Sequence, residues 1–151
     1  MERRFDRIAA VVVALVLVTF PSVIIASTSL DLRDDHGSLL VKVEAAGDVR
    51  GSGGQKLGHI EDGGTIRDKS GSKLGSVETG GSLRDASGSF VGKVNADGEL
   101  RGKSGVKLGE ISNDGSIRDS HGKLKGHVKP YDSGERLRVA ALIFFFTAWG
   151  K

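Results

Sequence analysis

Aliphatic and polar residues follow one another along most of the chain in a pattern that repeats every seventeen positions. Written in blocks of seventeen, residues 32–133 fall into register without an insertion. Positions one, nine and twelve of the six blocks are aliphatic, and Lys125 is the single exception. The first positions are Leu32, Val49, Ile66, Leu83, Leu100 and Ile117. So regular an apolar pattern indicates a repeat architecture and not a disordered Gly-rich linker.

Two turn signals divide each block into two short strands. The first is Asp-x-Ser-Gly, as at residues 68–71, which suits a tight turn with Gly in the left-handed region. The second is an Asp-Gly or Gly-Gly pair, as at Asp97-Gly98, which is favoured in the primed turns of hairpins. Strands such as 82–84 and 90–94 lie between these turns. Each block therefore predicts one small β-hairpin.

The apolar positions provide only a small core, so hairpins with open edges would be poorly stable. We expect an all-β fold, a closed ring or capped stack of six short 17-residue β-hairpin repeats in residues 28–133. Strands near Leu32 and Val128 would pair to close the ring. Position ten is Gly in five blocks, and there it would allow the close backbone approach or bulge that a narrow ring requires. These residues are Gly58, Gly75, Gly92, Gly109 and Gly126.

The N-terminal segment 1–27 is apolar and begins with basic residues. Ile8 to Ala26 carries no charge, and three arginines precede it. This pattern predicts an N-terminal hydrophobic helix, which is either a cleaved signal peptide or a retained membrane anchor. A buried helix of a soluble protein is the third alternative. The first two place the repeat domain in the cell envelope, either anchored to the inner membrane on its periplasmic or extracellular side, or secreted.

The C-terminal segment 134–151 is a short hydrophobic tail. Val139 to Trp149 is eleven residues long, too short to cross a bilayer. An exposed run of this kind must be covered. It could fill the core of the domain, lie in the membrane interface, or pack against a protein partner or a second copy. We assign the aromatic residues of the tail to contact with membrane or partner; they are Phe144, Phe145, Phe146 and Trp149.

Composition excludes several classes of function. The chain has no Cys, which excludes disulfides, zinc–thiolate sites and a thiol nucleophile. A net charge of +3 from 22 basic and 19 acidic residues gives nucleic-acid binding little support. His36 and His121 share position five and would become neighbours in a closed ring, but turn histidines are usually solvated. The serines belong to the repeated turns. We therefore expect no enzyme, no cofactor and no metal site.

Position two of every block is Arg, and alternation along the strand points it away from the core. These residues are Arg33, Arg50, Arg67, Arg84, Arg101 and Arg118. A ring of arginines could bind an anion such as a phosphate, a sulfated glycan or a lipid headgroup. The other interpretation, which we favour, is that each Arg pairs with a carboxylate of its own or a neighbouring block. Glu44, Glu61 and Glu78 are available for such pairs.

The repeated IRDxSGxKLGxVxxDG pattern, the hydrophobic N-terminus and the Phe-rich tail together resemble the bacterial family of five-fold β-flower proteins. The resemblance implies a ring of short hairpins with pseudo-rotational symmetry, an envelope location and no established activity. The sequence contains six copies of the repeat, whereas the family name specifies five. Whether the ring closes with five-fold or six-fold symmetry therefore stays open. We expect a non-catalytic structural or interaction module of the envelope, an accessory subunit of a membrane assembly; the alternative is an anion- or glycan-binding module that uses the arginine ring.

Overall fold

The computed structural model describes residues 28–149 of the chain. Within this part lie twelve β-strands, a 3₁₀ turn at Ser133–Glu135 and one α-helix, α1, at Arg136–Phe146. The strands are β1 (Leu30–Asp34), β2 (Leu39–Val43), β3 (Asp48–Gly51), β4 (Lys56–Ile60), β5 (Thr65–Asp68), β6 (Lys73–Val77), β7 (Ser82–Asp85), β8 (Phe90–Val94), β9 (Glu99–Gly102), β10 (Lys107–Ile111), β11 (Ser116–Asp119) and β12 (Leu124–Lys129).

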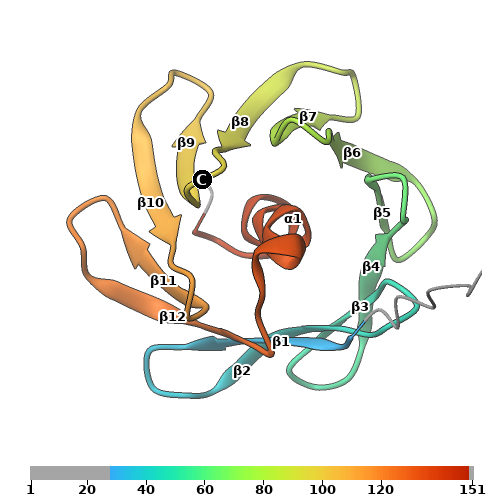
Figure 1. The fold of residues 1–151 in the computed structure, drawn as a ribbon. Helices are drawn as coiled ribbons and strands as arrows, with labels where there is room; N and C mark the ends of the chain where they lie inside the picture. The colour runs from blue at the N-terminus through green and yellow to red at the C-terminus, as the bar shows by residue number, and fades with distance from the viewer. Residues whose placement is uncertain (1–27, 150–151) are drawn as a thin grey trace, which may run out of the picture.

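The strands form a closed antiparallel ring (Figure 1). Each strand pairs with its neighbours in sequence, and β1 pairs with β12 to close the circle. Leu32 stands opposite Val128 in that closing pair, as the sequence predicts. Two strands come from each seventeen-residue block. Closure leaves no sheet edge to attract another chain.

The two kinds of turn have the same backbone geometry. In the turns within blocks, Gly71 N–H donates to Asp68 O and Asp68 N–H to Ser72 O. In the turns between blocks, Gly81 N–H donates to Glu78 O and Glu78 N–H to Ser82 O. Each is a type I turn followed by a left-handed Gly. The prediction of primed turns for the second kind is wrong, because primed turns at pairs such as Asp97-Gly98 would put a non-Gly residue at positive φ, and no described one has it.

The aliphatic side chains of positions one and twelve point into the ring and form its core. Leu32, Ile66 and Leu83 are completely buried, as is Val43. Within every block the register slips at position one or two, so that a β-bulge bends the hairpin outward. The bulge also occurs in the first block, where position ten is Val41, so it does not depend on Gly. Of the two alternatives, the close backbone approach is the one that requires the glycines, since a Cβ at Gly58 or Gly75 would meet a carbonyl oxygen of the paired strand.

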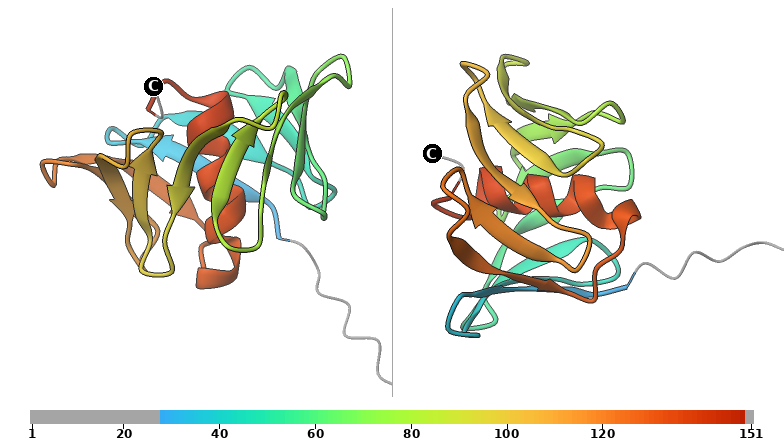
Figure 2. Two further views of the ribbon diagram at one scale, coloured as in Figure 1. Left: turned by 90° about the horizontal axis from the view of Figure 1, so that it is seen from above. Right: turned by 60° about the vertical axis from the view of Figure 1, so that its left-hand side comes forward.

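The helix α1 fills the middle of the ring, and the side views show it running along the ring axis (Figures 1 and 2). All six residues from Val139 to Phe144 are buried. A helix that is apolar on every side is stable only when it is surrounded on every side. The ring provides that surrounding wall, and the buried residues of the helix join its aliphatic side chains in one core.

The aromatic tail packs on the position-ten glycines. A Cβ added at Gly92 would meet Phe144, one at Gly75 would meet Phe145, and one at Gly58 would meet Phe146. Trp149 lies over Gly126 in the same manner. Our assignment of these four aromatic residues to membrane or partner contact is thus corrected. Of the three alternatives, the core of the same domain is the one observed, because the missing side chains of the glycines leave room for the rings.

Our prediction of an N-terminal helix over residues 1–27 lies outside the described residues. In the described part, no helix is both long enough and apolar enough to span a bilayer.

Candidate functional site

The six arginines of position two form a regular row on the outer face of the ring. Each guanidinium donates from Nη1 to the carbonyl of the left-handed Gly in its own turn. The distances are 3.0 Å for Arg33 to Gly37, 3.1 Å for Arg50 to Gly54, 3.0 Å for Arg67 to Gly71, 3.1 Å for Arg84 to Gly88, 2.7 Å for Arg101 to Gly105 and 3.1 Å for Arg118 to Gly122. Each Arg therefore ties its strand to the turn that follows.

Five of the arginines also hold a carboxylate. Three of these are the pairs that the sequence suggested: Arg50 with Glu44 at 2.9 Å, Arg67 with Glu61 at 2.6 Å and Arg84 with Glu78 at 2.6 Å. Arg101 pairs with Glu99 at 2.6 Å and Arg33 with Asp31 at 3.1 Å. The pairing interpretation is confirmed at these positions. The hydrogen bond from Arg67, together with its charge, lowers the pKa of Glu61.

Arg118 differs from the other five. The residues of positions thirteen and seventeen before it are Ser112 and Ser116, where the other blocks provide a carboxylate at one or the other. Within residues 28–149, Arg118 has no carboxylate at ion-pair distance, and its guanidinium bonds to the Gly122 carbonyl. All six arginines therefore bond to their own turn, but the one on β11 has no carboxylate partner to balance its charge.

The double variant Arg67→Ala plus Arg84→Ala is expected to lower the melting temperature. Each substitution removes a half-exposed ion pair, which contributes at most about 1 kcal/mol, and a hydrogen bond to a turn carbonyl, which contributes about 1 kcal/mol. Thermal unfolding measures the effect. Arg118→Ala is the control, because it removes only the bond to the turn and should cost less than Arg84→Ala. An unchanged melting temperature of the double variant would contradict a structural role for the row.

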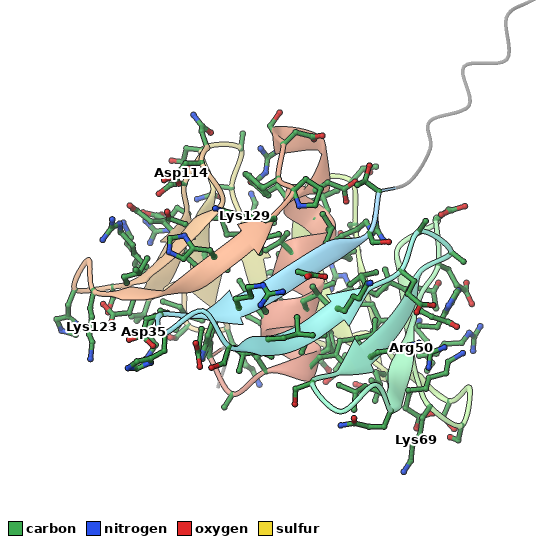
Figure 3. The ribbon with its side chains drawn as sticks, turned by 90° about the horizontal axis from the view of Figure 1, so that it is seen from below. Asp35, Arg50, Lys69, Asp114, Lys123 and Lys129 are labelled. Atoms are coloured by element: carbon green, nitrogen blue, oxygen red, sulfur yellow. The ribbon has the colours of Figure 1, made fainter. Side chains whose placement is uncertain are left out.

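The turns at the two ends of the ring differ in charge, although Lys129 (Figure 3), Arg136 and Arg138 also lie at the end with the acidic turns. The turns that join one block to the next carry eight carboxylates and no basic residue, which we call the acidic rim. Its carboxylates are Glu44, Asp48, Glu61, Asp62, Glu78, Asp97, Glu99 and Asp114. The turns at the opposite end carry both signs (Lys69, Lys123 and Asp35, for example), and Figure 3 shows these three at that end with Asp114 at the acidic rim.

The acidic rim is also where α1 enters the ring. Arg136 Nη1 donates to Ala96 O at 2.8 Å and Arg138 Nη2 to Glu44 O at 3.3 Å, so arginines of the helix hold two turns of the rim. A hollow of about 620 Å³ lies beside them, between the turns that contain Asp62 and Glu78 and the start of the helix at Leu137. Sequence reasoning missed this hollow, because it depends on where the helix lies.

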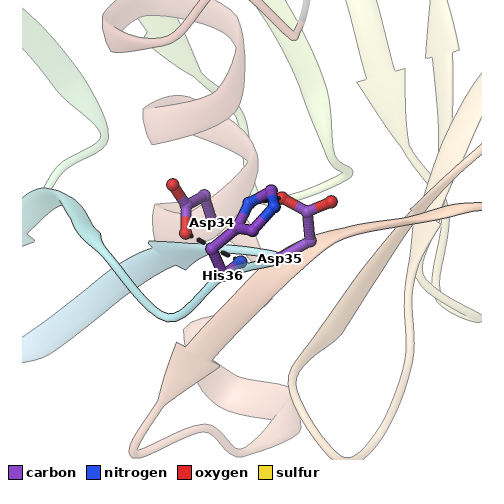
Figure 4. Close-up of side chains that lie close together, drawn as sticks. All are labelled: Asp34, Asp35 and His36. Atoms are coloured by element: carbon purple, nitrogen blue, oxygen red, sulfur yellow. Dashed lines mark hydrogen bonds and ion pairs between the residues drawn. The ribbon is translucent and has the colours of Figure 1, made fainter.

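Asp34, Asp35 and His36 form a small cluster in the turn between β1 and β2 (Figure 4). His36 Nδ1 lies 2.8 Å from Asp35 Oδ1. Asp34 Oδ1 accepts the backbone N–H groups of His36 and Ser38, as the aspartates of the other turns do. The cluster is largely exposed, and its hydrogen bonds are those of an ordinary Asx turn. His36 is thus grouped with carboxylates of its own turn.

A second histidine takes part in a tighter network at the acidic rim. Asp48 Oδ1 lies 2.8 Å from Lys56 Nζ and 2.9 Å from His59 Nδ1. Hydrogen bonds from Lys56 and then His59 lower the pKa of Asp48. This network links β3 to β4 and has the character of a structural ion pair.

Comparison with known proteins gives one match. The model of the family described as 5-fold beta-flower protein matches residues 29–147. The chain belongs to this family. No curated protein and no solved structure matches it. The matched range covers the whole ring and the helix within it, so α1 is part of the β-flower.

One further region of the β-flower departs from the repeat, and the sequence carries its signal. Lys125 stands where the other blocks have Leu40, Leu57, Leu74, Val91 and Leu108. The exception is visible in the sequence. The surroundings of Lys125, however, are formed by Trp149 and the end of α1, which lie more than twenty residues further along the chain. The repeat pattern does not predict the position of these residues.

Proposed function

We propose that this β-flower is a non-catalytic protein of the bacterial envelope that acts as a structural or interaction module, as an accessory subunit of a membrane assembly. The observation that carries the proposal is the direction in which the chain enters the ring. Leu30 of β1 pairs with Val43, next to the turn at 44–48, so the chain enters at the acidic rim. The basic and apolar segment 1–27 then directs the acidic rim toward the membrane.

Five of the eight rim carboxylates are paired with an Arg or Lys of the chain. The three others, Asp62, Asp97 and Asp114, have no Lys or Arg at ion-pair distance among the described residues, and their charge favours a protein partner. Anionic headgroups repel carboxylates, so a rim that faces the membrane gains little from lipid. A partner surface with lysines and arginines complements it and is steered toward it. The hollow beside Asp62 and Glu78 offers a concave place for such a contact. The C-terminal tail is not part of the proposed contact surface, because α1 lies inside the ring.

The alternative, an anion or glycan site made of the whole arginine row, has less support. Five of the six guanidinium groups already hold a carboxylate of the chain. An incoming anion would have to displace those carboxylates.

The location is tested by intact mass after separation of membrane and soluble fractions. Under the proposal, the native chain is found in the membrane fraction near 15.9 kDa, or outside the cytoplasm with residues 1–27 removed. Full-length chain in the cytoplasmic fraction would overturn the envelope location.

The contact surface is tested by a photo-crosslinking residue placed at Asp62 in the full-length chain in its native membranes. The matched control carries the same residue at Lys69, on an exposed turn at the opposite end (Figure 3). We expect a discrete cross-linked product from position 62 and none from position 69. The yield of this product should decrease when the chain also carries the substitution Glu78→Gln. Equal products from both positions, or none from position 62, would overturn the assignment of the acidic rim.

A further inference from the structure

The aromatic residues of the tail cover the position-ten glycines of the ring unequally. Gly58, Gly75 and Gly92 each face a Phe ring, and Gly126 faces Trp149. Gly109 lies between Gly92 and Gly126 around the ring. The atoms nearest to a Cβ at Gly109 are backbone atoms of Arg118 and Asp119. One of the five glycine places is thus left without the ring that fills the others.

A cavity of about 230 Å³ lies at this place, between β10, β11 and the end of α1. Leu108, Ile143, Phe144 and Trp149 form the apolar part of its lining, and polar groups form the rest. An engineered apolar cavity of roughly 150 Å³ binds benzene. The space beside Gly109 therefore suits a small aromatic group or a chain of several carbons.

A cation lines the same cavity. Lys125 is half-buried there, in the position that is aliphatic in the other five blocks. Among residues 28–149, no carboxylate lies within ion-pair distance of its ammonium group. Asp119 is the nearby acid on which its charge acts, and Asp119 Oδ1 already accepts the backbone N–H groups of His121 and Lys123.

The neighbouring cation is short of a partner as well. Arg118 is among the residues that line the cavity. It is the member of the arginine row without a carboxylate at ion-pair distance, because the two positions that provide one elsewhere are occupied by Ser112 and Ser116. Two departures from the repeat thus meet at this cavity, an uncovered glycine and a half-buried lysine, while the guanidinium of Arg118 on β11 bonds to Gly122 on the outer face. Together they make a cavity with apolar and polar lining and a cation at its side.

We propose that this cavity binds a small organic anion with an apolar body, of the class of medium-chain carboxylates. The carboxylate lies at Lys125, and the apolar chain lies against Trp149 and Phe144. Small-ligand sites have this composition, with an apolar wall and few polar groups that fix the orientation. The proposal is independent of the envelope location and of the acidic rim.

Octanoate is the probe, and Trp149 is the reporter, because it is the only Trp of the chain. Octanoate is expected to change the Trp149 fluorescence of the full chain in a saturable manner, and 1-octanol, which has the same chain without the charge, at least tenfold more weakly. Equal affinity for the two probes, or no response to octanoate at millimolar concentration, would overturn the proposal.

Lys125→Leu supplies the second measurement. This variant restores the residue type of the other five blocks, so it is expected to fold, and thermal unfolding verifies this. Octanoate should bind it at least tenfold more weakly, while octanol binding is unchanged or tighter. Lys69→Leu is the matched control, since it makes the same change of charge on the turn between β5 and β6, which does not line the cavity. If Lys69→Leu weakens octanoate as much as Lys125→Leu does, the effect is one of net charge and the cavity is not the site.

Discussion

Replacing Gly75 by Ala is expected to lower the free energy of unfolding by about 3 kcal/mol, which for a domain of this size lowers the melting temperature by roughly 10 °C. A Cβ at this position would clash with the carbonyl oxygen of Arg84 on the paired strand and would lie 2.6 Å from two ring atoms of Phe145. The carbonyl belongs to a closed sheet and cannot move far, and the ring is held by the helix. Thermal or urea unfolding measures the change.

Gly80→Ala is the matched control, in the same block. Nothing lies within 4 Å of a Cβ at Gly80, and its φ is outside the left-handed region. We expect a change within about 0.5 kcal/mol there, as at surface positions generally. Similar melting temperatures for the two variants would show that the aromatic rings do not lie on the glycine wall in solution.

Replacing Leu142 by Ala is expected to cost about 2–5 kcal/mol, the range for a fully buried Leu whose site cannot collapse. Leu142 is 0% exposed, near the middle of α1. The closed strands around it limit how far the wall can move inward, so most of the cavity should remain. Since a whole domain is stable by only about 5–15 kcal/mol, this variant would leave a small margin.

Val106→Ala provides the comparison for this second variant. Val106 is 62% exposed, on the turn between β9 and β10, so its truncation should change the free energy of unfolding by less than about 0.5 kcal/mol. If Leu142→Ala were as mild as Val106→Ala, α1 would not be the core of the ring, and the tail would again be a candidate for contact outside the domain.

Much of the ring could be predicted from the sequence because its determinants are local and repeated. The fixed period predicts the left-handed Gly of each turn and the alternation of buried and exposed residues around Leu83 and Ile66. The need to pair the open sheet edges predicts the pair of Leu32 with Val128. The turn type did not follow, because Asp-Gly and Gly-Gly pairs are compatible with a type I turn whose last residue is the left-handed Gly. The pairing of Arg67 with Glu61 could be predicted from their regular spacing.

The position of the tail could not be predicted in the same way. Val139 to Phe144 is apolar on every side, a property shared by a helix in a ring, in a protein interface or in a membrane surface. The sequence alone determined the period, the positions of the turns and the arginine row, since each depends on residues that are neighbours in the chain or related by the repeat. Only the tertiary structure decided that Phe144, Phe145 and Phe146 lie on three successive glycines and that Gly109 is left uncovered. These contacts join residues far apart in the chain, and the angle between successive side chains on a helix sets which part of the wall each one meets.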